Sequence, residues 1–287
     1  MAVSHAFRPR VAVRRTPPEL YFVVSAVFHY LGPSFAVLLF ARVTPLGVAW
    51  LRIATAAAIF VVWRRPWQAL RIRDVQALGC VLAAVNACFY LAIARLPLGT
   101  VAAIEFLPVI ALAALGARAP RNWAALALAV AGVYALVDVR LSARPVGVVF
   151  AFANAALFAA YIVLAHRVAR RSDLPPLDGL AAAMLAATLV VTPIGGSSVV
   201  PALLDPVALA AGVGVGVASS VVPYVFDQLA MARLSRATYS LLVSLLPATA
   251  TLIGIVVLAQ IPTALELGGV ALVVGGVALH READTSA

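Results

Sequence analysis

The sequence predicts an all-α polytopic membrane protein, with ten transmembrane helices in two inverted five-helix repeats. Hydrophobic residues make up 64% of the chain and charged residues only 11%, which is more apolar surface than a soluble domain can bury. The chain divides into ten apolar stretches, and each is long enough for the ~20 residues that cross a ~30 Å hydrocarbon layer. The gaps between the stretches alternate in charge, and a short motif recurs in the two halves.

The apolar stretches follow one another with short loops, so no soluble catalytic or nucleotide-binding domain is expected. In order they lie at 20–40, 46–63, 75–94, 98–116, 122–138, 146–165, 178–194, 207–229, 237–258 and 263–279. The first follows a basic run, as in a signal peptide, but it is longer than a typical signal core and contains Pro33. We therefore expect it to be retained, and we expect the protein to work inside the membrane without hydrolysing ATP.

All 21 basic residues are arginines, and 16 of them fall on one side of the membrane when the gaps are taken in order. These are Arg8, Arg10, Arg14, Arg15, Arg64, Arg65, Arg71, Arg73, Arg118, Arg121, Arg167, Arg170, Arg171, Arg233, Arg236 and Arg281. The opposite side has Arg42, Arg95, Arg140 and Arg144, and Arg52 falls inside the second stretch. By the positive-inside rule we expect a bacterial inner-membrane protein with both termini in the cytoplasm. The net charge of +10 then faces anionic lipid, and no nucleic-acid partner is expected.

A short motif recurs at a similar offset in the two halves. Residues 94–100 read ARLPLGT after the third stretch, and residues 232–238 read ARLSRAT after the eighth. The predicted units are a cytoplasmic tail at 1–19, five-helix repeats at 20–140 and 145–280, and a cytoplasmic tail at 281–287. Because five is odd, the second repeat enters the membrane from the opposite side, and a substrate site is expected between the repeats. Chance similarity between helices rich in Ala, Leu and Val is the alternative explanation.

Glu105 is the strongest functional candidate, because it lies in the middle of the 98–116 stretch. An ionisable group inside a membrane costs several kcal/mol unless it is paired, protonated or hydrated. A carboxyl group at this depth could alternate between protonated and charged forms, or hold a substrate ammonium group. The alternative is a structural carboxyl group that a neighbouring helix satisfies.

Several more polar side chains in the stretches are candidates to line a cavity. Arg52 could bind a substrate carboxylate or serve as the counter-ion of Glu105, or it could extend to the near interface. Asn86 and Tyr90 are four residues apart and share one helix face. Three weaker candidates are His29, Asn154 and Tyr161. For the five uncharged candidates the alternative is hydrogen bonding between helices.

Enzymatic and metal-binding chemistries leave no motif. The chain has no GxSxG, HExxH or CxxC sequence, and its four histidines are too scattered to form a metal site. We therefore expect no enzyme activity, no cofactor and no metal. Gly212, Gly216 and Ser220 recur every fourth residue, which predicts a smooth ridge for close helix packing rather than a phosphate-binding loop.

Residues 86–108, NACFYLAIARLPLGTVAAIEFLP, resemble the drug/metabolite transporter superfamily of EamA type, and there the threonine/homoserine exporter branch. The resemblance extends over about 20–280. It implies ten helices in two inverted halves, and export of amino acids or related metabolites, with protons as the exchanged ion. It also implies a central cavity, onto which it maps Arg52, Asn86, Tyr90, Glu105 and Tyr161.

Two departures from the family pattern bear on the substrate. The family often has Glu before the proline of the ninth helix, where this chain has Leu246, and Gly-Glu after that helix, where it has Ala259 and Gln260. We therefore expect proton-coupled export of small polar metabolites, with a broad exporter of hydrophobic or aromatic compounds as the alternative. Two alternatives come from other functional classes. One is an intramembrane enzyme that uses Glu105 with His29, and the other is a passive channel.

Overall fold

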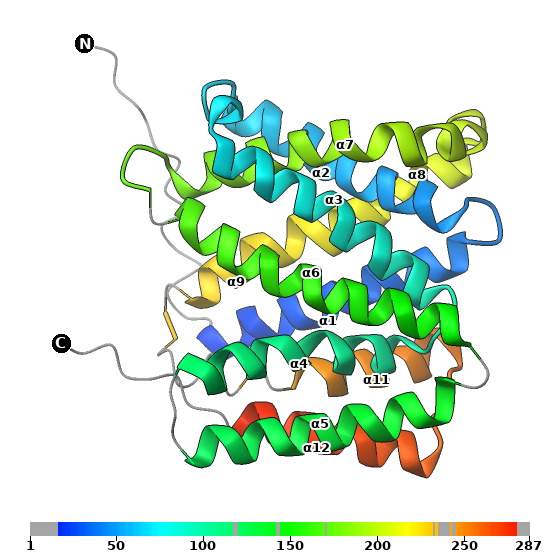
Figure 1. The fold of residues 1–287 in the computed structure, drawn as a ribbon. Helices are drawn as coiled ribbons and strands as arrows, with labels where there is room; N and C mark the ends of the chain where they lie inside the picture. Colours follow the sequence, from blue (N-terminus) through cyan, green and yellow to red (C-terminus); the bar gives the residue numbers. More distant parts are fainter. Residues whose placement is uncertain are drawn as a thin grey trace.

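Every regular element that the structure describes is a helix (Figure 1). This computed structural model describes residues 17–116, 120–141, 144–169, 171–231, 233–234, 242 and 245–279. The elements are α1 (Pro18–Leu39), α2 (Pro45–Arg64), η1 (Ala69–Arg71), α3 (Arg73–Ile93), α4 (Leu98–Gly116), α5 (Pro120–Leu141), α6 (Pro145–Ala169), α7 (Pro176–Leu204), α8 (Pro206–Gly216), η2 (Val217–Val221), α9 (Val222–Met231), α11 (Leu246–Leu258) and α12 (Ala264–Leu279). α1 begins and α12 ends at the same end of the bundle (Figure 1).

The helix boundaries follow from proline. α1, α2, α5, α6, α7 and α8 all begin with proline, whose fixed φ suits the first helical turn and whose missing N–H needs no partner there. Side chains cap two of these starts. The Thr44 hydroxyl accepts from the Gly47 N–H of α2 at 3.2 Å, and the Asp205 carboxylate accepts from the first turn of α8.

The predicted membrane protein is confirmed at the level of an all-α polytopic chain. Six helical spans in the described residues are long and apolar enough to cross a membrane: Glu19–Leu39, Pro45–Arg64, Arg73–Ile93, Pro145–Val168, Leu177–Leu204 and Pro206–Phe226. Shorter apolar helices lie at Leu98–Pro108, Leu246–Leu258 and Ala264–Leu279. The first part of the predicted 237–258 stretch lies mostly outside the described residues, so ten crossings remain a prediction.

Two stretches differ from their predicted form. α7 continues past the predicted end at 194 to Leu204, because Gly195 serves a helix contact instead of ending the helix. A Cβ at Gly195 would lie 2.8 Å from the Leu46 carbonyl oxygen, so only glycine lets α7 approach α2 this closely. The predicted 207–229 stretch is α8 and α9 joined by η2, a single π-helical turn.

The helices pack in a recurring set of pairs. α2 packs on α7, α5 on α12, and α4 on α11. α3 packs on α6 and α7, while α1 and α2 both pack on the α8–η2–α9 segment. An ion pair joins α2 and α7, from Arg64 to Asp178 at 2.6 Å, and a second joins the residues that precede α2 and α8, from Arg42 to Asp205 at 2.9 Å. The centre of the bundle is therefore walled by α1, α2, α3, α4, α6 and η2.

Candidate functional site

Arg52 of α2 is held by the π-helical turn. Ser219 lies in η2, and Pro223, four residues later, has no N–H to complete an α-helical bond to the Ser219 carbonyl. In membrane helices such released carbonyls are satisfied by neighbouring groups. Arg52 Nη2 donates to Ser219 O at 3.1 Å, and Arg52 Nε donates to Ser220 Oγ at 3.1 Å. The proline and the π turn thus provide the acceptors that fix the guanidinium group.

Glycines bring these helices together. A Cβ at Gly32 of α1 would overlap the backbone and the hydroxyl group of Ser219, and one at Gly216 would overlap the side chain of Thr55 on α2. Gly212 likewise lies against α2. The predicted ridge of small residues is therefore the surface on which α2 rests, and its last member, Ser220, bonds Arg52.

Glu105 of α4 lies at the same centre and is 8% exposed. Its carboxyl group interacts electrostatically with Arg52 from α2 and with Tyr30 from α1, and it lies beside the Asn154 amide group from α6. Four helices therefore meet at one buried carboxyl group. The Arg52 guanidinium group therefore binds η2 and also interacts electrostatically with Glu105, while its binding of a substrate carboxylate stays a prediction.

Two aromatic groups complete the cluster. Tyr90 of α3 is buried, and its ring centroid lies 5.8 Å from Arg52 Cζ, within the range of a cation–π interaction. The rings of His29 and Tyr30 meet edge-on, with their centroids 5.2 Å apart, and His29 also interacts electrostatically with Arg52. The structure thus brings together five of the predicted site residues: Arg52, Glu105, Asn154, Tyr90 and His29.

The described contacts of Asn86 and Tyr161 are with groups outside the Arg52–Glu105 cluster. Asn86 Nδ2 donates to the Leu82 carbonyl one turn earlier at 2.8 Å, so this donor serves its own helix. Tyr161 stacks on Phe158 at 5.8 Å and packs against the hydrophobic cluster of α2, α3 and α7. For these two residues a direct place in the site stays a prediction.

Unpaired polar atoms surround the Arg52–Glu105 pair. In the described part of the chain, the buried side-chain atoms with no hydrogen-bond partner are Tyr90 Oη, Ser219 Oγ, and both amide atoms of Asn154. The contact of Asn154 with Glu105 lacks hydrogen-bond geometry and leaves the amide group unsatisfied. Leaving a buried polar group unpaired costs roughly 1–3 kcal/mol, so these four atoms favour a hydrogen-bonding partner such as a water molecule or a polar ligand.

Sequence reasoning missed two features of the structure, one at this site and one near the start of α12. Ser219 and Ser220 are small residues in an apolar stretch, and the available signal was Pro223, which had to release a carbonyl. Glu266 is buried to 2% exposure near the start of α12, and its signal was the Thr-x-x-Glu spacing from Thr263.

Comparisons with known proteins agree with this architecture. The sequence profile of the EamA-like transporter family matches residues 145–281. The chain is 30% identical over 267 residues to the threonine/homoserine exporter RhtA of Escherichia coli strain K12, covering 89% of each chain. It is 30% identical over 258 residues to RhtA of Salmonella typhimurium strain LT2, covering 87% of this chain and 86% of the relative. A solved crystal structure shares the fold with a TM-score of 0.57 and 21% identity, over 91% of this chain and 96% of the other.

Proposed function

Since the chain belongs to the EamA-like transporter family, we propose that it exports small polar metabolites, with amino acids such as threonine and homoserine as the expected cargo. The observation that carries the proposal is the Arg52–Glu105 pair inside the membrane, surrounded by unpaired polar atoms. The two charges match the carboxylate and ammonium groups of a zwitterion. The RhtA relatives, which are named as threonine/homoserine exporters, support the same class.

Each charged group has a distinct role in the proposed mechanism. Arg52, fixed by η2, receives the substrate carboxylate, and Glu105 in its charged form receives the ammonium group. The Asn154 amide, which has both a donor and an acceptor to offer, suits a substrate hydroxyl group. Glu105 takes up a proton from the outside when the substrate leaves and releases it to the cytoplasm, which couples export to proton entry.

Alternating access follows from two inverted repeats, residues 20–140 and 145–280. The helix contacts support this division, because several of them recur when each helix of one half is replaced by its counterpart in the other half. The contact of α3 with α6 corresponds to that of α8–η2–α9 with α1, and the contact of α4 with α6 corresponds to that of α11 with α1. Rocking of the halves would then open the site to either side of the membrane, with both termini in the cytoplasm.

A broad exporter of hydrophobic compounds is the second candidate, and Leu246 favours it. This residue stands where the resembled family often has a carboxylate, and it packs against apolar clusters of the core. Gln260, the second departure, accepts a hydrogen bond from the Leu98 N–H at 3.0 Å and so has a structural role at the start of α4.

Efflux from vesicles tests the proposal. Purified protein in vesicles loaded with labelled L-threonine should show efflux that an imposed proton gradient accelerates. Glu105→Gln should abolish that acceleration and lower efflux by at least about a hundredfold, since it removes the ammonium partner and the proton carrier. Asp173→Asn, which changes an exposed carboxylate, serves as the matched control. Unchanged transport and pH dependence in Glu105→Gln would refute the proton role, and efflux of phenylalanine without threonine would favour the second candidate.

A further inference from the structure

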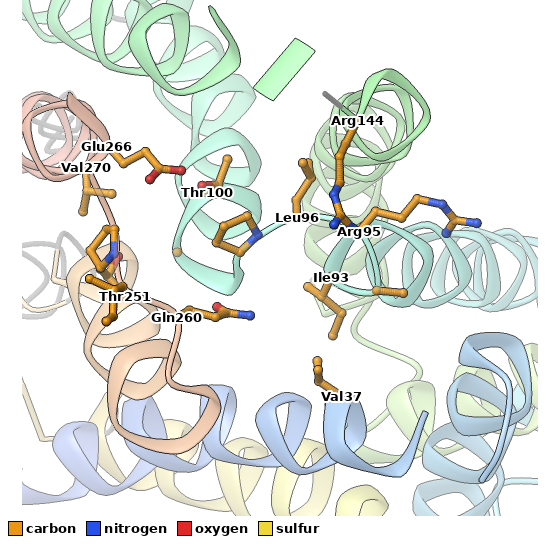
Figure 2. Close-up of a pocket in the computed structure, with 15 residues that line it drawn as sticks. Val37, Ile93, Arg95, Leu96, Thr100, Arg144, Thr251, Gln260, Glu266 and Val270 are labelled. Carbon is orange, nitrogen blue, oxygen red and sulfur yellow. The ribbon is translucent and has the colours of Figure 1, made fainter. Parts of the chain in front are cut away.

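A second polar pocket lies at one end of the bundle (Figure 2). It is lined by the loop between α3 and α4, the loop between α11 and α12, and the residue that precedes α6. Its volume is about 340 Å³, at the lower end of the range for small-molecule sites. We call it the α4–α12 pocket, and its polar lining is Arg95, Thr100, Arg144, Thr251, Gln260 and Glu266. It is distinct from the Arg52–Glu105 site, whose residues do not line it.

Glu266 provides a fixed negative charge on one wall. Thr263 donates to Glu266 Oε2 from its backbone nitrogen at 2.9 Å and from its hydroxyl group at 3.1 Å, while Glu266 N donates back to Thr263 Oγ1 at 3.2 Å. This capping box holds the carboxylate at the start of α12. Figure 2 shows the carboxylate directed toward Thr100, into the pocket.

Arg144 provides a positive charge on the opposite wall (Figure 2). It lies just before α6 and is exposed, so its guanidinium group is available to a ligand in the pocket. Arg95 differs, because its Nη1 donates to the Leu91 carbonyl at 2.7 Å and its Cζ lies 5.6 Å from the Phe150 ring centroid. One carboxylate and one available guanidinium group thus face each other across a small cavity.

The geometry points to a second binding site for a small zwitterion, and we propose that Arg144 receives its carboxylate and Glu266 its ammonium group. The proposal rests on the exporter function proposed above, and it assigns the pocket to the same amino-acid cargo. Thr100 lines the pocket and lies five residues before Glu105 on α4, which corresponds to about 7.5 Å along the helix. The pocket is therefore a staging site next to the central one, at the end of the bundle with the fewer predicted arginines.

Protection of an introduced thiol tests the pocket locally. Ala94 lines the pocket and is partly exposed, so Ala94→Cys in a Cys80→Ala/Cys88→Ala background puts a single reactive group there. L-Threonine should slow its modification by a small maleimide at least threefold. Threonine methyl ester and N-acetylthreonine, which each lack one charge, should protect about tenfold less effectively.

Removing either charged group of the pocket should remove the protection. Arg144→Gln and Glu266→Gln are the test variants, and glutamine at 266 can still form the capping box, which keeps α12 intact. Arg42→Gln, on the same end of the bundle but outside the pocket, is the control and should leave protection unchanged. Glu105→Gln should retain protection while efflux is lost.

The outcomes separate this inference from the exporter proposal. Absence of protection in the parent protein, or protection that survives both Arg144→Gln and Glu266→Gln, would overturn the pocket while threonine efflux still supports the exporter. Protection without any threonine efflux in the parent would overturn the exporter proposal and the staging role together, leaving only an amino-acid site. Size-exclusion profiles of each variant in detergent establish that the compared proteins are folded.

Discussion

Glu105 and Glu266 are both buried carboxyl groups on membrane helices, but their surroundings differ. Glu266 is held by a residue three positions away, through a capping box at the start of its own helix. Glu105 depends on groups from three neighbouring helices, and the polar atoms beside it are unpaired. A carboxylate that is bonded within its own first helical turn keeps those bonds when neighbouring helices move. One that depends on its neighbours changes its environment whenever those helices move, which is what a coupling residue requires.

Removing Arg52 should have the largest effect, because it takes away a group on which Glu105 depends and Glu266 does not. Arg52→Gln leaves Glu105 without its counter-ion, which should lower the free energy of unfolding by about 3 kcal/mol and threonine efflux by at least about a hundredfold. Denaturant titration in detergent and vesicle efflux measure the two effects. Combining Arg52→Gln with Glu105→Gln should recover most of the lost stability without restoring transport. A double variant as unstable as Arg52→Gln would show that the two charges do not interact.

Crowding the π turn should disturb the surroundings of Glu105 indirectly, through Arg52. The added methyl group of Gly32→Ala would overlap Ser219, displace the acceptors of Arg52 and lower the free energy of unfolding by about 2 kcal/mol. Efflux should fall with it. Gly214→Ala is the matched control, because a Cβ there meets no atom within 4 Å. Equal effects of the two substitutions on stability and efflux would contradict the close contact at Gly32.

Weakening the capping box should disturb the surroundings of Glu266 and leave those of Glu105 unchanged. Thr263→Ala removes the hydroxyl group that bonds both the Glu266 carboxylate and its N–H, which should lower the free energy of unfolding by about 1 kcal/mol. The proton dependence of efflux should not change, since Glu105 keeps its partners. A shifted pH profile in Thr263→Ala would mean that the two carboxylates are coupled and that the contrast between them is wrong.

Relieving backbone strain beside the α4–α12 pocket should have the smallest effect. Ala259 ends α11 with φ at 52°, in the left-handed region that glycine adopts without penalty, and the resembled family often has glycine there. Ala259→Gly should therefore raise the free energy of unfolding by about 0.5–1 kcal/mol. Thermal unfolding in detergent measures it, with Ala264→Gly as the control, which should destabilise the first turn of α12. A loss of stability in Ala259→Gly would contradict the assigned conformation.

The sequence predicted what depends on local composition. Apolar stretches bounded by prolines indicated most helix positions, and Glu105 and Arg52 were found because an ionisable residue stands out against Ala, Leu and Val. It did not predict the continuation of α7 through Gly195, since that glycine has a role only once α2 lies against it. The binding of Arg52 by Ser219 joins residues 167 positions apart, and it depends on a helical irregularity that no hydropathy pattern records. The burial of Glu266 likewise depends on tertiary packing, although its Thr-x-x-Glu spacing was visible.

The π turn also sets a length requirement on the chain. Deleting one residue between Val217 and Val221 would allow an uninterrupted α-helix, yet it would rotate everything after it by about 100° relative to α8. The Pro223 carbonyl, which accepts from Ser25 Oγ at 3.3 Å, would then leave its partner on α1, and the Ser219 carbonyl would leave Arg52. A one-residue deletion in η2 is therefore expected to separate Arg52 from both of its acceptors, so the length of this turn is itself a requirement of the site.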